Sequence, residues 1–95
     1  MNILTEAELQ AGLEALGDPW QVVEGRLTRS WRLSNFDEAL RWVNALGELA
    51  EAHRHHPDLA LGWGYVRLSL WTHDAGGLTA LDLRLASAIA DLKGP

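Results

Sequence analysis

The 95-residue chain contains no cysteine. It therefore has no disulfide framework, no thiolate nucleophile and no zinc–thiolate site, which excludes the small disulfide-rich proteins and the zinc fingers. It also lacks a run of the roughly 18 apolar residues that a membrane-spanning helix requires. Residues 1–10 carry glutamates where a secretory signal has a basic region and an apolar run. We expect a cytoplasmic protein without a membrane partner.

Positive charge is scarce, since 8 Lys and Arg residues stand against 13 Asp and Glu residues. The formal net charge of -5 argues against a nucleic-acid partner, because such binding depends on cations that neutralise phosphates. Arg26, Arg29 and Arg32 form a local basic stripe, but an arginine at every third position is more often a solvated edge. We therefore expect no nucleic-acid partner.

Proline is rare as well, and the sequence shows neither a linker nor an internal repeat, so we interpret residues 1–95 as one domain. A domain of this size buries roughly 60 to 65% of its unfolded surface, so association into a homodimer or homotetramer would add to a modest stability. Tryptophan is abundant by contrast. The 5 tryptophans suit a small core, a subunit interface or a flat heteroaromatic ligand.

The first part of the chain predicts a helix and two strands. Thr5 begins a Thr-Glu-Ala-Glu segment with the spacing of a capping box, and Gly17 supplies a left-handed stop. One face of this helix carries Leu9, Leu13 and Leu16. Residues 20–23 and 27–33 then predict two strands, with three of the four residues on one side of the second strand apolar.

A second helix is predicted to open within residues 34–38, to run to about His53 and to end before Pro57. Apolar residues recur along it every three or four positions, at Phe36, Leu40, Val43, Leu46 and Ala50. This spacing indicates an amphipathic helix with that face toward the core.

Residues 63–73 alternate as a strand does. Val66, Leu68 and Leu70 lie on one side, and the other carries Trp63, Tyr65, Arg67, Ser69, Trp71 and His73. Residues 59–61 predict a short further strand, and a last helix starts at Thr79 and buries Leu81, Leu85, Ala88, Ile89 and Leu92. The order α-β-β-α-β-β-α predicts an α+β two-layer sandwich, a four-stranded antiparallel sheet with three helices on one face.

Three of the 4 histidines lie within residues 53–56. An unperturbed imidazole has a pKa of about 6.5 and can both give and take a proton at neutral pH, so the cluster indicates proton-transfer chemistry. His55 and His56 are adjacent and must point in different directions, and Glu51 lies one helical turn before His55, within reach of an imidazole. The alternative is a helix stop with solvated histidines.

Two further residues have both a functional and a structural interpretation. His73 ends the aromatic strand face, although a lone histidine there is usually a surface residue. Asp82 follows Thr79 at capping-box spacing, so its alternative role is to cap the helix alone. Metal binding by the histidines is not expected, because His53 and His55 would point apart on a helix and the chain has no His-x3-His pair.

Taken together, these motifs resemble the pterin-4a-carbinolamine dehydratase family. The shared pattern is Glu-x3-His-His-Pro from Glu51, a tryptophan six residues after the proline, and Thr-His-Asp-Ala-Gly-Gly-Leu-Thr-x2-Asp from Thr72 to Asp82. The order of elements matches over essentially the whole chain, and residues 36–90 carry the specific motifs. The resemblance implies dehydration of 4a-hydroxytetrahydropterin to quinonoid dihydropterin, which recycles the cofactor of aromatic amino-acid hydroxylases and needs no metal or redox cofactor.

The resemblance also implies a site. His55, His56 and His73 correspond to the family's catalytic histidines, Asp82 to its active-site aspartate and Glu51 to its pterin-contacting glutamate. Our hypothesis is that His55 and His73 divide the acid and base roles, in an order left open, while His56 orients the 4a-hydroxyl. The predicted substrate-binding residues are completed by Thr72 and by two tryptophans that would form an aromatic wall, Trp63 and Trp71.

The chain departs from the family pattern at Arg54, at Trp63 and at the glycines on either side of Trp63, Gly62 and Gly64. Arg54 stands where a small polar or acidic residue often precedes the histidine pair, and Trp63 stands where tyrosine is usual. The alternative function is a non-enzymatic dimerisation or assembly scaffold on the same fold, since some relatives act in that way. A scaffold, however, has no need for three histidines in register with Glu51 and Asp82.

Overall fold

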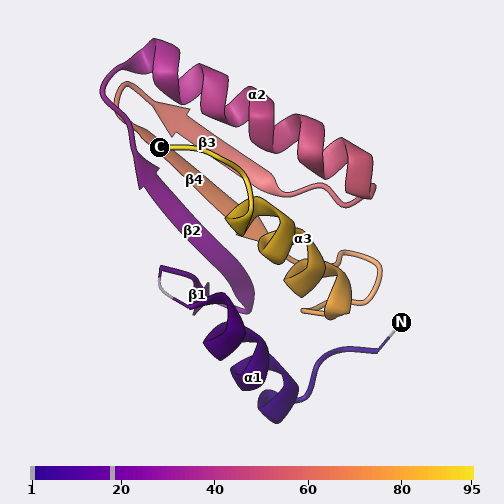
Figure 1. Ribbon diagram of the computed structural model, residues 1–95. Helices are drawn as coiled ribbons and strands as arrows, with labels where there is room; N and C mark the ends of the chain where they lie inside the picture. Colours follow the sequence, from indigo (N-terminus) through magenta and orange to yellow (C-terminus); the bar gives the residue numbers. More distant parts are fainter. Residues whose placement is uncertain (1, 18) are drawn as a thin grey trace.

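The computed structural model describes residues 2–17 and 19–95. It contains three helices and four strands in the order α-β-β-α-β-β-α (Figure 1), which confirms the predicted fold class. The elements are α1 (Glu6–Leu16), β1 (Gln21–Val23), β2 (Arg26–Arg32), α2 (Phe36–His53), β3 (Asp58–Gly62), β4 (Tyr65–Leu70) and α3 (Ala80–Ala90).

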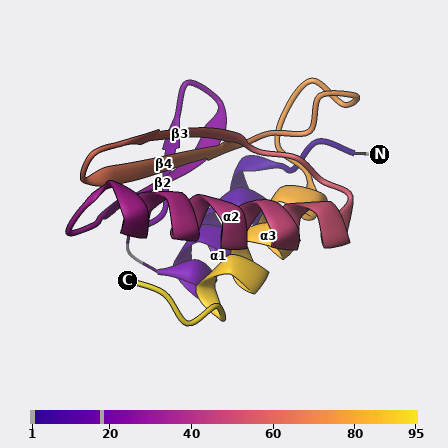
Figure 2. The same cartoon turned by 90° about the horizontal axis from the view of Figure 1, so that it is seen from above.

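The strands form one antiparallel sheet in the order β1-β2-β4-β3. The register is fixed by facing residues such as Trp31 and Val66 on β2 and β4, and Leu61 and Val66 on β3 and β4. The three helices lie on one side of this sheet (Figure 2), so its other face is open to solvent. Among the described residues, no helix is long and apolar enough to cross a membrane.

The capping signals in the sequence are present in the structure. Thr5 and Thr79 each form a complete capping box, with Glu8 and Asp82 as the third residues. Asn35 caps α2 through its side chain, which accepts from the Glu38 amide. These side chains satisfy amide groups that helix starts leave without partners, which is why all three helices begin where the sequence predicts.

The core lies between the sheet and the helices. Its fully buried large side chains include Leu27, Leu46, Leu68, Leu70, Leu85 and Ile89. Trp31 and Trp42 pack edge to face with ring centroids 5.4 Å apart, which joins β2 to α2. Arg29 shares this side of β2 and stacks over the Trp20 and Trp31 rings, and burial lowers the pKa of its guanidinium.

The predicted core face of α2 is partly wrong. The buried residues are Ala39, Trp42, Leu46 and Ala50, whereas Phe36 is 51% exposed and Leu40 is 42% exposed. Both rows have helical spacing, and the helix turns the row that contains the bulky Trp42 toward the sheet. Phe36 and Leu40 are thereby left as an apolar stripe on the outer surface.

The aromatic strand is shorter than the predicted 63–73. β4 covers Tyr65–Leu70, because its pairing with β2 ends at Leu70 opposite Leu27. Trp63 therefore lies in the turn between β3 and β4, and Thr72 belongs to a separate bridge with Gly77. The short strand predicted at 59–61 is confirmed as β3. In α3, Leu85 and Ile89 are buried as expected, while Leu81, Ala88 and Leu92 are half-buried.

Candidate active site

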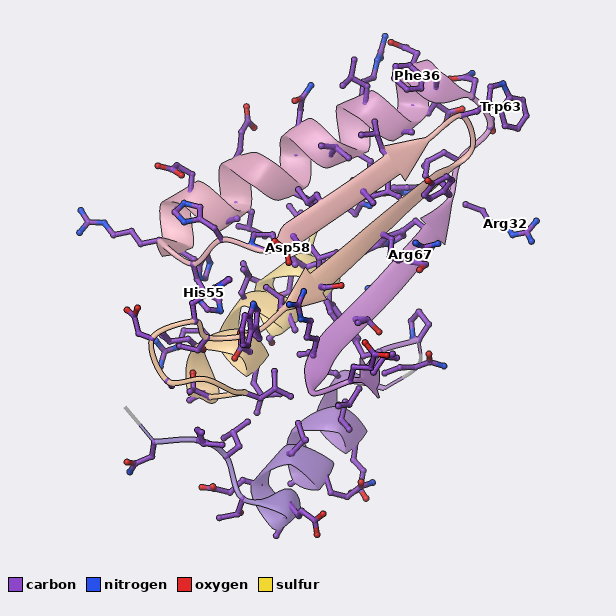
Figure 3. The ribbon with its side chains drawn as sticks, turned by 180° about the vertical axis from the view of Figure 1, so that it is seen from behind. Arg32, Phe36, His55, Asp58, Trp63 and Arg67 are labelled. Carbon is purple, nitrogen blue, oxygen red and sulfur yellow. The ribbon has the colours of Figure 1, made fainter. Side chains whose placement is uncertain are left out.

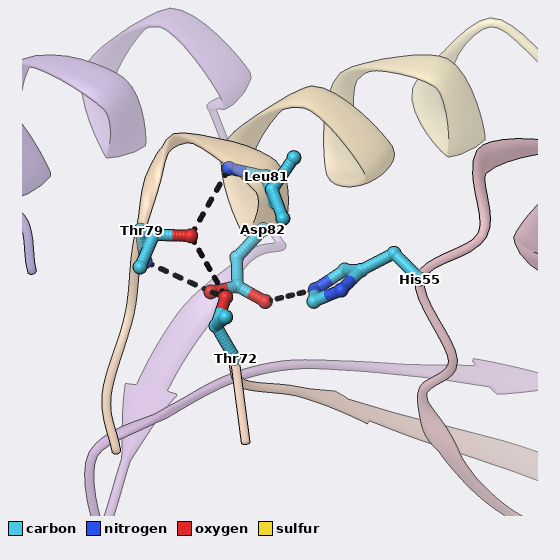
Figure 4. A network of polar contacts seen from close by, with 5 residues as sticks. All are labelled: His55, Thr72, Thr79, Leu81 and Asp82. Atoms are coloured by element: carbon cyan, nitrogen blue, oxygen red, sulfur yellow. Dashed lines mark hydrogen bonds and ion pairs between the residues drawn. The ribbon is translucent and has the colours of Figure 1, made fainter. Parts of the chain in front are cut away.

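The carboxylate of Asp82 is fully buried at the start of α3 and lies at the centre of a polar network (Figure 4). Its Oδ2 accepts from the Thr79 amide at 2.9 Å and from the Thr72 hydroxyl at 2.8 Å. Its Oδ1 lies 2.5 Å from Nε2 of His55. Burying a carboxylate is costly unless its oxygens accept hydrogen bonds, and here both oxygens have donors.

The proton positions in this network follow from the number of donors. The Thr72 hydroxyl has one proton and gives it to Asp82, so the Thr79 hydroxyl must donate to Thr72 across their 2.8 Å contact. The Thr79 hydroxyl in turn accepts from the Leu81 amide at 3.2 Å. When Asp82 is ionised, its Oδ1 accepts a hydrogen bond from Nε2–H of His55. The Nδ1 of that neutral ring then keeps a lone pair that can take a proton.

The end of α2 separates the two adjacent histidines. Arg54 adopts a left-handed conformation with φ 52°, and the amides of Arg54 and His55 return to the carbonyls of Glu51 and Ala50 at 3.1 Å. This is a Schellman ending formed without glycine. It turns His55 inward, where it is buried, while His56 stays exposed.

Glu51 contacts His56 and not His55. Its Oε2 lies 2.7 Å from Nε2 of His56, and both side chains are exposed. The expected one-turn contact with His55 does not form, because the helix ends at His53 and His55 has left the helical face. Each histidine of the adjacent pair therefore has a carboxylate of its own.

The three histidines come together at one pocket. Its volume is 250 Å³, and its lining residues are Arg54, His55, His56, Thr72, His73, Asp74 and Leu81. His73 is exposed, and its ring packs on Trp71 with centroids 4.6 Å apart and planes at 55°. Asp82 stands behind His55, and Glu51 stands beside His56. Six of the eight predicted site residues are therefore at this pocket. Four of them line it, and Asp82 and Glu51 each form a hydrogen bond to a histidine that lines it.

The two predicted wall tryptophans do not line the pocket. Trp63 is 74% exposed at the far end of the β3–β4 hairpin from His55 (Figure 3), so a single chain does not bring it to the histidines. Trp71 is half-buried and backs His73. Conversely, Arg54, Asp74 and Leu81 line the pocket although the sequence did not single them out as site residues. Each is next to a predicted site residue in the sequence, and this adjacency is the signal that could have identified it as a pocket residue.

Within residues 2–17 and 19–95, no three histidine, aspartate or glutamate side chains are grouped as a metal site. The carboxylates near the pocket are used individually, with Asp82 on His55 and Glu51 on His56. The site therefore contains three imidazoles that line one pocket, and two of them are hydrogen-bonded to carboxylates. Such a set can move protons to and from a bound small molecule.

Residues 2–92 match the family model for pterin 4 alpha carbinolamine dehydratase. The chain belongs to this dehydratase family. A Chloroflexus aurantiacus protein whose name assigns it provisionally to pterin-4-alpha-carbinolamine dehydratase is 44% identical over 94 residues, covering 99% of this chain and 100% of that protein. A Picosynechococcus protein with the same provisional name is 43% identical over 89 residues, covering 94% of this chain and 96% of that one.

One similar solved structure supports membership of the dehydratase family, and a second shares the fold. A transcriptional coactivator/pterin dehydratase from Brucella melitensis superposes with a TM-score of 0.83 at 37% identity, covering 93% of this chain and 95% of that one. A pterin dehydratase-like protein that is a RuBisCO assembly factor in the alpha-carboxysome reaches 0.58 at 19% identity, with coverages of 75% and 82%. The latter likeness shows the fold alone. The family match includes the whole pocket and the Asp82 network.

Proposed function

We propose that this protein dehydrates 4a-hydroxytetrahydropterin to quinonoid dihydropterin and water. The observation that carries the proposal is the buried Asp82–His55 pair behind a pocket that His56 and His73 also line. Membership of the dehydratase family supports the substrate class. A cytoplasmic location, and a functional link to an aromatic amino-acid hydroxylase that supplies the carbinolamine, belong to the same proposal.

The reaction requires one proton to be delivered and one to be removed. The C4a–O bond breaks as the hydroxyl accepts a proton and leaves as water, and the N5 proton is removed as the C=N bond forms. The two transfers balance, so no oxidant or reductant is consumed. Imidazoles suit both transfers, because their ordinary pKa lies close to neutral pH.

The hydrogen bonds favour His55 as the base. Asp82 accepts a hydrogen bond from Nε2–H of His55, so Nδ1 has the lone pair that takes the N5 proton, and the carboxylate stabilises the imidazolium that results. His73 is then the acid that protonates the leaving hydroxyl. His56, whose ring Glu51 orients at 2.7 Å, binds that hydroxyl. The second oxygen of Glu51 can accept from the amino and ring N–H groups of the pterin.

Association into a homodimer or homotetramer is also part of the proposal. Phe36, Leu40 and Trp63 are exposed large apolar residues, and Figure 3 shows Phe36 and Trp63 at the same end of the molecule. β3 is an edge strand, which offers unpaired backbone groups to a second copy. Such an interface would cover an apolar surface that is costly to leave in water. It would also give Trp63 a role that the pocket of its own chain does not.

The decisive experiment is stopped-flow absorbance of carbinolamine decay, with the carbinolamine generated in situ by an aromatic amino-acid hydroxylase. Wild type is compared with His55→Ala and with His53→Ala as a matched control that removes an imidazole two residues away. We expect faster decay with wild type and with His53→Ala, and about 100-fold or greater loss of kcat in His55→Ala.

The alternative is the non-enzymatic scaffold, which the exposed apolar residues would serve equally well. An oligomeric wild-type protein that leaves carbinolamine decay at its spontaneous rate would overturn the dehydratase proposal and favour the scaffold. Equal loss in His55→Ala and His53→Ala would show that the histidine pocket is not the site.

A further inference from the structure

Four residues from three segments, Arg26, Asp58, Trp71 and His73, form a continuous contact series that ends at the pocket. Nη1 of Arg26, at the start of β2, lies 2.9 Å from Oδ2 of Asp58, at the start of β3. The guanidinium carbon of Arg26 lies 4.8 Å from the ring centroid of Trp71. The Trp71 ring in turn packs on His73, which lines the pocket.

The sheet register explains why these residues meet. Leu27 faces Leu70 across β2 and β4, so Arg26 falls opposite Trp71, the residue that follows β4. Asp58 faces Ser69 on the other side of β4. Side chains alternate along a strand, so Arg26, Asp58 and Trp71 emerge on the same open face of the sheet. The contact series is therefore set by backbone pairing that extends well beyond the pocket.

His73 depends on this series more than His55 and His56 do. His55 and His56 are each oriented by a carboxylate, at 2.5 Å and 2.7 Å. Within the described part of the chain, the contact that orients His73 is the packing of its ring on Trp71. His73 is exposed and lies beyond the end of β4, so its ring would otherwise sample several rotamers.

We propose that Arg26 is a positioning residue for His73. Arg26, held by Asp58, fixes the Trp71 ring through a cation–π contact, and Trp71 fixes the imidazole of His73 at the pocket. The inference rests on the proposed dehydratase function for its kinetic consequence only. Trp71 thereby acts through His73 and not as a wall against the pterin.

The test compares Arg26→Gln with Arg67→Gln. Arg67 is a matched control, because it lies on the same open face but its guanidinium stacks over Tyr65 at 5.4 Å. The first readout is the NMR signal of the His73 ring protons, assigned with His73→Gln, since the nearby indole shifts these protons by its ring current. We expect the signal to move toward the free-histidine position in Arg26→Gln and to stay in place in Arg67→Gln.

The second readout is kinetic. Misplacing one proton-transfer group lowers kcat more than it raises KM, so we expect Arg26→Gln to lower kcat about three- to tenfold at nearly unchanged KM. Arg67→Gln should keep the wild-type values. Trp71→Phe, which keeps an aromatic ring beside His73, should recover most of the kcat that Trp71→Leu loses.

The two proposals fail separately. An unmoved His73 signal in folded Arg26→Gln overturns the positioning role whatever the activity is. A shifted signal in a protein without dehydratase activity supports the positioning role and overturns the function. Asp58→Asn provides a second variant if Arg26→Gln does not fold, and it should move the His73 signal in the same direction by a smaller amount.

Discussion

Nε2 of His55 lies 2.5 Å from Oδ1 of Asp82, and the carboxylate of this pair is fully buried while the imidazole reaches a pocket. The same carboxylate completes the capping box of α3 through the Thr79 amide. Asp82 therefore combines the two roles that the sequence presented as alternatives. A helix terminus and a candidate catalytic base are held by one residue, so a change at Asp82 should affect stability and activity together.

Replacing Asp82 by asparagine tests this double role. The amide nitrogen of asparagine cannot accept a hydrogen bond, so either the His55 contact at Oδ1 or both the Thr72 and Thr79 contacts at Oδ2 lose their acceptor. We expect the free energy of unfolding to fall by about 1–3 kcal/mol and kcat to fall about 100-fold or more. Urea denaturation and stopped-flow kinetics measure the two effects.

Asp37→Asn is the control for Asp82→Asn, because it also converts an aspartate in the first turn of a helix but lies in an exposed pair with Arg41. It should leave kcat unchanged. A wild-type kcat in Asp82→Asn would contradict the assignment of His55 as an Asp82-oriented base.

Thr72→Val separates the hydroxyl from the shape of the side chain. Valine fills the same space but removes the donor to Asp82 and the acceptor of the Thr79 hydroxyl, both of which are buried. We expect a loss of about 1–2 kcal/mol in unfolding free energy and a lower kcat, measured as above. Thr72→Ser keeps the hydroxyl and should stay close to wild type in kcat. If serine and valine gave equal kcat values, the hydroxyl would have no part in orienting Asp82.

The sequence predicted the element order and most of the pocket, because capping boxes, glycine stops and the motif residues act over a few positions. Three features depended on longer-range packing. The core face of α2 was ambiguous between two apolar rows, and the burial of Trp42 decided it. The histidine that Glu51 contacts depends on where α2 ends. The helix ends at a left-handed Arg54, a position where glycine is usual, so the residue type did not indicate the end of the helix.

Trp63 is the third such feature. Counting alternate positions back from His73 placed it on the aromatic strand face, but β4 starts at Tyr65 and Trp63 lies in the turn. An alternating pattern does not show where pairing ends, since that depends on the partner strand. For this reason the sequence alone did not indicate that Trp63 lies far from the histidines.

The left-handed conformation of Arg54 predicts an unusual stabilising change. A side chain in this region costs roughly 1–2 kcal/mol, and glycine avoids the strain at some cost in chain entropy. We expect Arg54→Gly to raise the free energy of unfolding by about 1 kcal/mol. Thermal and urea unfolding measure it. Arg54→Ala removes the same charge but keeps the strain, so a gain of equal size in the alanine variant would assign the effect to charge and not to the backbone.

The exposed apolar stripe on α2 predicts the effect of a charge at Leu40. Leu40 is 42% exposed and lies one helical turn from Phe36, which is 51% exposed. If this surface is the interface between copies, a glutamate there must be buried without a partner, which is costly. We expect Leu40→Glu to shift the protein from an oligomer to a monomer at micromolar concentration, as measured by light scattering.

Ala7→Glu is the control for Leu40→Glu, because it places the same charge on an exposed residue of α1. It should remain an oligomer. Circular dichroism should show that both variants keep the wild-type helix content, because neither change disturbs a fully buried side chain. A monomeric wild-type protein, or an oligomeric Leu40→Glu variant, would show that Phe36 and Leu40 do not form the interface. Retained dehydratase activity in a monomeric Leu40→Glu variant would show that the pocket is complete in one chain, and that Trp63 is not needed from a second copy.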